Sequence, residues 1–157
     1  GAALCGGRAY ALLADFFAQT ARMMGMDTNA PYAAYAAMEG LLKSADRPED
    51  VPTVLPLFEG TRQDSTQTGS ITGLTAENFT PLHLIYGMMD GMAHELHQMY
   101  QAYRAAGGTA KKLIGSGGGL RNNRFLCESF SRAFDSEITL SDGREEAACG
   151  AALYAAD

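Results

Sequence analysis

Three consecutive glycines, Gly117–Gly119, separate a short apolar run from an amphipathic one in the stretch KKLIGSGGGLRNNRFLCESF. Glycine loses more conformational freedom on folding than any other residue, so three in a row are costly to order. Two interpretations are open. The glycines could serve only a tight connection from a strand to a helix. Alternatively, they let the backbone lie against a flat or anionic ligand at a helix N-terminus, where unpaired N–H groups favour phosphate.

The two familiar nucleotide-binding motifs do not fit these glycines. A dinucleotide fingerprint needs Gly-x-Gly-x-x-Gly; Gly115 and Gly117 match it, but Leu120 stands in the third place. A phosphate-binding P-loop needs Gly-Lys-Ser/Thr, which this stretch lacks. A nucleotide contact of another type remains, with glycine backbone on one side and the side chain of Asn122 or Asn123 on the other.

The C-terminal third of the sequence predicts a layered α/β domain. We expect strands over 111–115 and 137–141, and helices over 122–134 and 145–156. An order of strand, helix, strand, helix predicts parallel neighbouring strands joined by helical crossovers. We therefore expect one α/β lobe with a mixed sheet flanked by helices.

Upstream, the pattern predicts three helices and two short strands. The first helix covers 8–24, with its apolar face formed by Leu13, Phe16, Phe17 and Met24, and the second covers 31–43, with Asn29 near its cap. The runs TVLPLF and SITGL read as strands. The longest helix starts at Thr80-Pro81 and ends at Gly107-Gly108; steps of three and four predict a buried seam of Leu82, Ile85, Met89, Met92, Leu96, Met99 and Tyr103.

Bulk composition limits the classes of function. A chain of 157 residues with 46% hydrophobic and 19% charged residues is typical of one globular domain, or one lobe of a larger protein. A net charge of −6 argues against a nucleic-acid partner. No apolar run approaches the roughly 20 residues of a membrane span. The odd cysteine count (Cys5, Cys127 and Cys149) indicates reduced thiols and a cytoplasmic protein.

Other candidate residues carry weaker signals. His94 and His97 lie three apart on the long helix, but without a third ligand nearby we expect no metal site. Glu145 and Glu146 precede an Ala-rich helix, and their carboxylates suit the positive N-terminal end of its dipole, so we expect a structural role for both. We expect Cys149, on the small-residue face of that helix, to be a packing residue. Arg62 lies in the polar loop EGTRQDSTQTG, where it could contact phosphate or an opposite lobe, or simply be solvated.

The motifs together resemble the C-terminal lobe of the FGGY carbohydrate kinases. GSGGGLRNN followed by EEAACGAALYAA is similar to that family's Gly-Gly turn, Asn and Glu-Ala-Ala-x-Gly-Ala-Ala helix. The loop PLFEGTRQD, the strand GSITGL, the step Asp90-Gly91 and the opening GAALCGGRAYALL match in the same order. Within the family, the run GTRQD, GSITGL and NFT is most similar to sedoheptulokinase-like members.

The resemblance covers residues 1–157 and implies an actin-like, ribonuclease-H-like ATPase lobe that binds ATP with Mg²⁺. By position, Gly7, Gly118 and Asn122 correspond to nucleotide-contacting residues, and we assign Gly117 and Gly119 of the same turn to the nucleotide as well. The family position four residues beyond Gly7, which can carry a polar contact, is Ala11 here. Thr61 and Thr68 also depart from the family loop, which often has Glu and Arg there.

The resemblance implies a function in phosphoryl transfer from ATP to a hydroxyl of a ketose or polyol. Sedoheptulose is one candidate for the acceptor. The family's catalytic aspartate and phosphate hairpin belong to the first lobe and to the start of the second, upstream of this chain, and the sugar is held mainly by the first lobe. We therefore expect no catalytic residue in these 157 residues and no activity from them alone. A homodimer is compatible with this reading. The alternative is a non-catalytic actin-fold module that binds a nucleotide or a partner.

Overall fold

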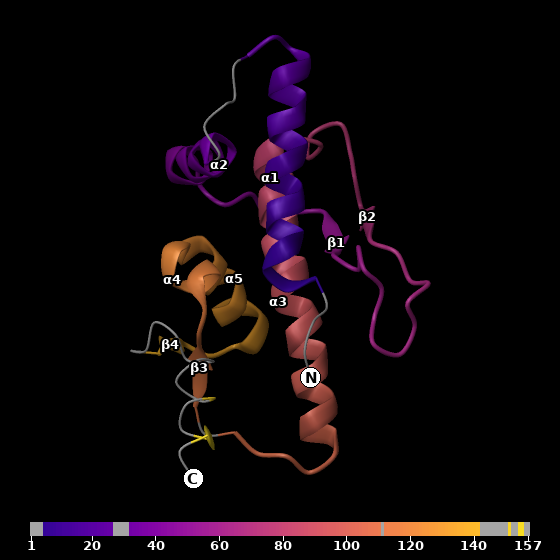
Figure 1. The fold of residues 1–157 in the computed structure, drawn as a ribbon, viewed down its shortest axis with the longest axis vertical. Helices are drawn as coiled ribbons and strands as arrows, with labels where there is room; N and C mark the ends of the chain where they lie inside the picture. Colours follow the sequence, from indigo (N-terminus) through magenta and orange to yellow (C-terminus); the bar gives the residue numbers. More distant parts are fainter. Residues whose placement is uncertain (1–4, 27–31, 111, 142–150, 152–153, 156–157) are drawn as a thin grey trace.

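The computed structural model describes residues 5–26, 32–110, 112–141, 151 and 154–155. A long central helix separates the β-strands into two groups, one on each side (Figure 1). In chain order the elements are α1 (Gly6–Met23), α2 (Ala33–Ser44), β1 (Thr53–Leu55), β2 (Ser70–Thr72), α3 (Pro81–Ala105), β3 (Leu113–Gly115), α4 (Gly118–Asn122), α5 (Arg124–Phe134) and β4 (Ile138–Leu140).

Helix α3 forms the axis of the lobe, and the sequence explains both of its ends. Thr80 has an extended backbone and caps the helix by accepting a hydrogen bond from the backbone N–H of His83, and Pro81 occupies the first turn. Gly107 follows the C-terminus with a positive φ of 87°, as the predicted helix end requires.

The predicted apolar seam of α3 is buried only in its middle. Ile85, Met89 and Met92 belong to the core, where α3 packs against α1, α5 and β1. Leu82 and Leu96 pack at the border of the core, whereas Tyr103, at the far end of the seam, is 52% exposed. The sequence period placed these residues on one face, but neighbouring elements cover only part of that face.

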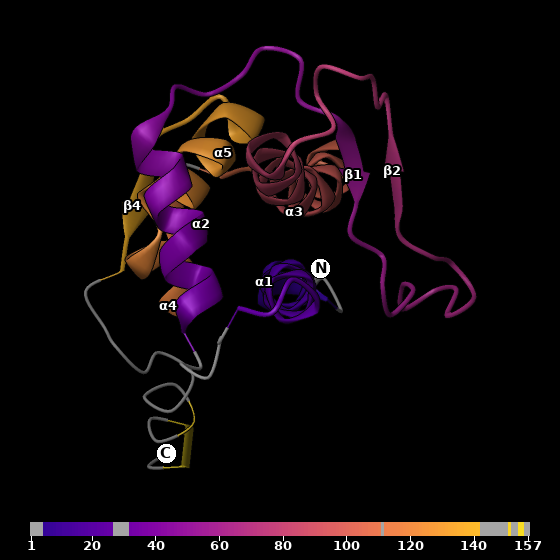
Figure 2. The same cartoon turned by 90° about the horizontal axis from the view of Figure 1, so that it is seen from above.

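The expected mixed sheet is wrong for the described residues, which form two separate two-stranded sheets. β1 and β2 pair antiparallel, with Val54 opposite Ile71. β3 and β4 pair parallel, with Ile114 opposite Thr139, which confirms the prediction of parallel neighbours for these two strands. The sheets lie on opposite sides of α3, as both views of the fold show (Figures 1 and 2), so no ladder joins them.

Two glycines of α3 explain how β1 comes to lie on this helix. A Cβ atom at Gly91 would overlap the carbonyl oxygen of Val54, and one at Gly87 would lie 2.8 Å from the carbonyl oxygen of Pro52. Only glycine leaves room for the strand backbone at this distance. The strand itself is shorter than the run TVLPLF predicted, because Pro56 follows it and cannot donate a backbone hydrogen bond.

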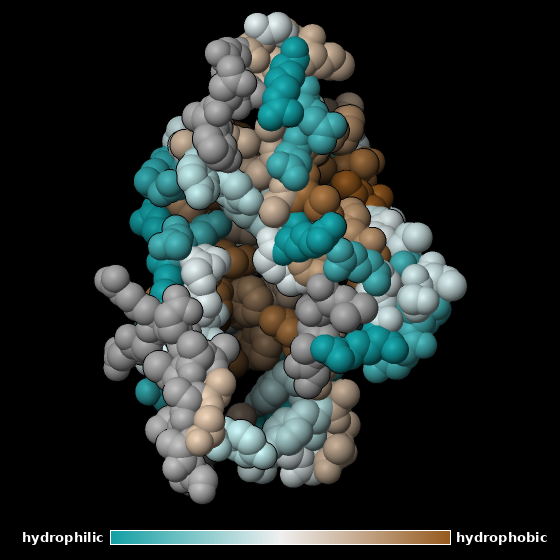
Figure 3. Space-filling view, in the orientation of Figure 1, coloured by the Kyte–Doolittle hydropathy of each residue, from teal (hydrophilic) through white to brown (hydrophobic). Residues whose placement is uncertain are grey.

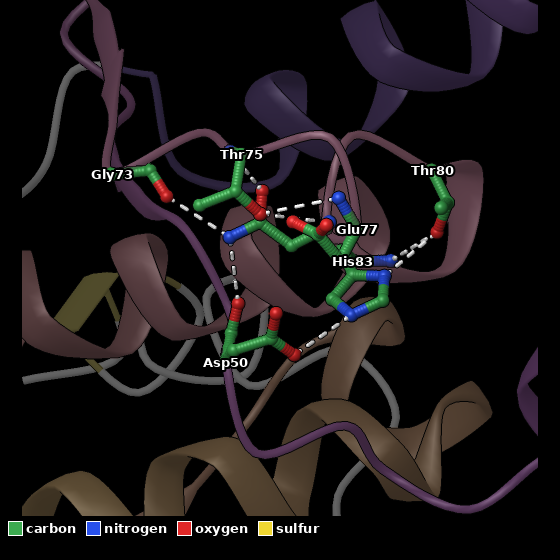
Figure 4. A network of polar contacts seen from close by, with 7 residues as sticks. Asp50, Gly73, Thr75, Glu77, Thr80 and His83 are labelled. Atoms are coloured by element: carbon green, nitrogen blue, oxygen red, sulfur yellow. Dashed lines mark hydrogen bonds and ion pairs between the residues drawn. The ribbon is translucent and has the colours of Figure 1, made fainter.

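A buried asparagine fastens the start of α3 to the surrounding loops (Figure 4). Asn78, only 3% exposed, donates to the carbonyl oxygens of Asp50 (3.0 Å) and Gly73 (2.9 Å) and accepts from the backbone N–H of Thr75 (2.8 Å). The ring of His83 lies between the hydroxyl of Thr80 (2.7 Å) and the carboxylate of Asp50 (3.1 Å). The buried amide of Asn78 therefore has hydrogen-bond partners on both its oxygen and its nitrogen, and it links three loop segments to one another.

Two further predictions need correction, and two others lie wholly or largely outside the described residues. In α1, Leu13 is buried, but Phe16 and Met24 are 55% and 66% exposed, so these two do not face the core. Helix α2 begins at Ala33 rather than at residue 31, and the cap expected at Asn29 lies outside the described residues. The final predicted helix, with Glu145, Glu146 and Cys149, also lies largely outside them.

The helix expected over 122–134 is confirmed as α5, which begins two residues later at Arg124, and a short helix that the sequence did not predict, α4, precedes it and ends at Asn122. The backbone of Asn123 is extended (φ −134°, ψ 96°), which ends α4, and its side-chain oxygen caps α5 by accepting from the N–H of Leu126 at 3.1 Å. Two adjacent asparagines, each compatible with a cap, left the exact start of α5 open in the sequence.

Candidate functional site

The three glycines of the turn after β3 have different structural roles. Gly117 precedes α4 with φ 95° and ψ 158°, a backbone conformation that is accessible essentially only to glycine. The fold therefore requires glycine at this position, whatever else the turn does.

Gly118 and Gly119 are not required by the backbone in the same way. Both lie in the first turn of α4, are exposed, and have no positive φ. The nearest heavy atom to a Cβ added at Gly118 would be Nδ2 of Asn122 at 3.8 Å, and at Gly119 it would be Cδ2 of Leu126 at 3.7 Å, both ordinary contacts. Alanine is a better helix former than glycine, and the two glycines leave a flat backbone surface open to solvent. The fold alone does not explain these two glycines.

Gly115, at the end of β3, allows the turn to pack closely onto the sheet. A Cβ at this buried position would lie 2.8 Å from Cγ2 of Ile138 and 3.0 Å from Cδ1 of Leu120. The missing side chain thus makes room for Leu120 of α4. The thiol of Cys127 then donates to the carbonyl oxygen of Leu120 at 3.1 Å and ties α4 to α5. These contacts attach α4, which carries Gly118 and Gly119, to the sheet and to α5.

The structure separates the two asparagines that the sequence left as alternatives. Asn123 is committed to the fold, because it caps α5 and its Nδ2 lies 3.7 Å from Sδ of Met89. Asn122 is exposed, and within the part of the chain that the structure describes its side chain makes no hydrogen bond. Of the two asparagines, Asn122 is therefore the one whose side chain is open to a contact outside the described residues.

Tyr10 of α1 connects this junction to the rest of the lobe. Burial raises the pKa of its hydroxyl to about 12, and a hydrogen bond with the side chain of Asn123 acts in the opposite direction. The ring of Tyr10 also packs on Tyr35 of α2, with centroids 6.1 Å apart. Sequence reasoning missed this residue, because a tyrosine on a helix face carries no signal of its partner.

A cavity of about 510 Å³ opens beside Asn122, between α2 and the junction of α4 and α5. Helix α2 contributes Glu39 and Lys43, whose side chains form an ion pair at 2.6 Å, and residues 121–125 form the other wall. Seen from above, α2 lies over α4 and α5 (Figure 2). Lys43, Arg121 and Arg124 outnumber Glu39, so the cavity is locally cationic in a chain of net charge −6.

The other predicted contact, Gly7, lies in the first turn of α1, where it is exposed and a Cβ would meet nothing within 4 Å. The space-filling view shows an apolar hollow in the middle of this face (Figure 3). In the same orientation of the ribbon, the start of α1 and the junction of β3 and α4 stand on the two sides of that region (Figure 1). The N-terminal end of α1 thus lies across this region from the junction of β3 and α4 (Figure 1).

Arg62 is not brought to this site. It lies exposed in the loop between β1 and β2, on the opposite side of α3 from α4 (Figure 1). Its loop is held by Asp64, whose carboxylate accepts from the N–H (2.9 Å) and hydroxyl (2.6 Å) of Thr66; these bonds lower the pKa of Asp64. Within this lobe, Arg62 and the glycine turn do not face one ligand.

A second cavity, of about 590 Å³, lies between α3, α5 and residues 47–54. Its most prominent charged groups pair with one another: Arg47 contacts both carboxylate oxygens of Asp90, and Arg132 approaches the same carboxylate at 3.5 Å. The guanidinium of Arg47 also lies 4.9 Å from the centre of the Tyr86 ring. In the sequence step Asp90-Gly91, the aspartate therefore has a structural role: its carboxylate links α3 to α5 and to the loop before β1.

Metal and membrane signals are lacking in the described ranges. No group of three or more His, Cys, Asp or Glu side chains there could hold a metal ion. His94 is exposed and hydrogen-bonded to Gln98 at 3.0 Å, while the ring of His97 packs against Phe134. None of the described helices is both long and apolar enough to pass through a bilayer.

Comparison with known proteins gives the site its context. Residues 1–156 match the model of the C-terminal domain of the FGGY family of carbohydrate kinases. The chain belongs to this family. A xylulose kinase of Bacillus subtilis (strain 168) is 27% identical over 93 residues, which are 59% of this chain and 18% of that protein.

Solved kinases share the fold. The lobe resembles a xylulose kinase from Rhodospirillum rubrum (TM-score 0.69, 23% identity, 85% of this chain and 25% of that one). It also resembles a glycerol kinase from Plasmodium falciparum, solved with ADP (TM-score 0.61, 18% identity, 90% of this chain and 27% of that one). This chain spans about a quarter of the length of these two kinases. The two small sheets and their helices are therefore those of a C-terminal lobe.

Proposed function

We propose that this chain is the nucleotide-binding lobe of an ATP-dependent sugar kinase, which transfers the γ-phosphate of ATP to a hydroxyl of a ketose or polyol. Family membership supports kinase chemistry. The observation that carries the lobe's role is the open backbone of Gly118 and Gly119, which the fold does not require and a Cβ would cover. A Plasmodium falciparum glycerol kinase solved with ADP, which shares the fold, is consistent with a nucleotide in this lobe.

In this proposal each residue of the turn has a distinct task. Gly117 shapes the turn, and the backbone of Gly118 and Gly119 lies against the flat face of the nucleotide. Asn122, whose amide has no other partner among the described residues, supplies a directional hydrogen bond. Gly7 approaches the nucleotide from the start of α1.

The lobe contributes binding and position rather than a catalytic group. Phosphoryl transfer depends chiefly on in-line positioning and on stabilising charge, and Mg²⁺ bound to the phosphates supplies part of that stabilisation. In this proposal the catalytic base belongs to the first lobe of the full-length protein, and the role of this lobe is to hold the nucleotide. Arg62 is a candidate for contact with the opposite lobe.

The identity of the acceptor is open to a narrower proposal. The relatives named above are xylulose and glycerol kinases, while the run GTRQD, GSITGL and NFT favours a sedoheptulokinase-like member. We propose a ketose or polyol acceptor and include sedoheptulose among the sugars to test. A panel of xylulose, sedoheptulose and glycerol, offered to the full-length protein with ATP, separates these acceptors by turnover.

The variants Gly118→Val and Asn122→Ala in the full-length protein test the nucleotide site. We expect weaker ATP binding from both, by about 5-fold or more for Asn122→Ala, because one hydrogen bond is lost. Melting temperature should change little, since Gly118 is not in the positive-φ region and its Cβ has room. Gln101→Ala, on the exposed face of α3, is the matched control. Unchanged ATP affinity in both variants would mean that the glycines serve only the turn.

A test on the chain itself separates the kinase from a non-catalytic module. We expect the 157 residues alone to turn over no ketose or polyol, and the full-length protein to turn over at least one. A full-length protein that binds ATP without turning over any acceptor would favour the module.

A further inference from the structure

We propose that Glu39 and Lys43 of α2 bind the ribose of the nucleotide and so set the preference of the site for ribonucleotides. The proposal rests on the function proposed above, because it extends the same site. Its basis is the cavity that these two side chains share with Asn122, the residue already assigned to the nucleotide. No signal in the sequence places α2 opposite the glycine turn.

The two side chains are pre-arranged for this contact. They lie one helical turn apart, and their charged ends meet at 2.6 Å. Their side chains are 54% and 59% exposed, respectively, so both can be reached from the cavity. A surface ion pair at this spacing contributes only a few tenths of a kcal/mol to helix stability, so stabilising the fold is a minor role for these two side chains.

The chemistry of the pair fits vicinal hydroxyl groups. An ionised carboxylate only accepts hydrogen bonds and has two oxygens, while an ammonium group only donates. The 2′ and 3′ hydroxyls of a ribose can donate to Glu39 and accept from Lys43 at the same time. Bonds to charged groups are stronger than neutral ones, which makes the contact selective even at a partly hydrated rim.

The arrangement of the walls favours the ribose over the base as the group that meets α2. A base is flat and largely apolar on its faces, and suits the open glycine backbone beside Asn122. The rim formed by Glu39 and Lys43 stays exposed and charged, which suits hydroxyl groups that keep part of their hydration. The cationic excess of Lys43, Arg121 and Arg124 attracts the anionic nucleotide to the cavity in an otherwise acidic chain.

The test compares ATP with 2′-deoxy-ATP in the full-length protein and in Glu39→Ala and Lys43→Ala variants. We expect the wild type to bind ATP about 10-fold more tightly than 2′-deoxy-ATP, because a hydrogen bond to a charged group is lost. Glu39→Ala should lose affinity for ATP but little for 2′-deoxy-ATP, so the preference disappears, and Glu39→Gln should restore part of it. Arg104→Ala, an exposed cation of α3 outside the cavity, is the charge control.

Three results would overturn the proposal, and they differ from one another. An unchanged preference for ATP in the Glu39 and Lys43 variants would show that the pair does not contact the ribose. An equal loss for both nucleotides in Lys43→Ala, with no change in preference, would show only general charge attraction. If the wild type binds neither nucleotide, the proposed function fails first, and this inference fails with it.

Discussion

The glycines of α3 and the glycines of the turn after β3 differ in what lies above their α-carbons. Over Gly87 and Gly91 stands the backbone of β1, so close that a Cβ at Gly91 would overlap the carbonyl oxygen of Val54. Over Gly118 and Gly119 a Cβ would meet only ordinary contacts, at 3.8 and 3.7 Å. The first pair serves packing between elements of the lobe. The second pair leaves a surface that only a ligand, or another part of the protein, would use.

This contrast gives a way to interpret a glycine-rich segment once its surroundings are known. A glycine that its own fold requires is recognised by a positive φ or by an atom in the place of its Cβ. A glycine with neither, in a helix where alanine is more stable, needs another reason. Gly117 belongs to the first class and its two neighbours to the second, although the three are adjacent in the sequence.

The largest expected effect is the loss of stability in Gly91→Ala. Because the added Cβ would overlap the carbonyl oxygen of Val54, β1 must move away from α3, at a cost of about 3 kcal/mol. Thermal or denaturant unfolding measures this cost. Gly40→Ala in α2 is the control: its Cβ meets nothing within 4 Å, so stability should rise by up to about 1 kcal/mol. Equal effects in the two variants would contradict the packing role of Gly91.

A smaller effect should separate Gly117 from Gly118. Gly117→Ala forces a side chain into a conformation with φ 95° and ψ 158°, which costs about 1–3 kcal/mol. Gly118→Ala should leave the free energy of unfolding unchanged or slightly increase it, because alanine favours the helix. The two unfolding curves, recorded under one condition, test the distinction. If the Gly118 variant is as unstable as the Gly117 variant, the fold requires glycine at both positions.

The smallest effect concerns the attachment of the turn to the core through Tyr10, and it appears only at alkaline pH. The folded pKa of Tyr10, about 12, is raised above its ordinary value of 10.0, so the folded state holds this proton more tightly than the unfolded state. The stability that this difference provides is present below pH 10 and is lost as pH rises toward 12. Melting temperature against pH should therefore fall less steeply in Tyr10→Phe.

Two comparisons are needed to interpret the change in melting temperature of Tyr10→Phe. Burial also raises the pKa of Tyr86, so some alkaline loss should persist in Tyr10→Phe. Tyr32→Phe, at a position that is 75% exposed, is the matched control and should follow the wild-type curve. If Tyr10→Phe also follows that curve, Tyr10 does not link α1 to the α4–α5 junction as described.

Much of the candidate site could be predicted because its signals are local. The run of glycines after a β-prone segment marked the turn, and the order of strand, helix and strand predicted the parallel pairing of β3 and β4. The long helix, its cap at Thr80 and its end near Gly107 also follow from short-range rules. Asn122 and Asn123 could not be separated in this way, because both residues suit a helix cap.

The sequence by itself determined the helices, the parallel strand pair and the glycine turn, since these depend on residues close together in the chain. Only the tertiary structure decided which apolar faces are covered, so that Leu13 is buried and Phe16 is not. It also decided that α3 divides the strands into two sheets, and that Glu39 and Lys43 share a cavity with Asn122. Such choices depend on contacts between residues that are far apart in the chain, and periodicity and propensity carry no information about those contacts.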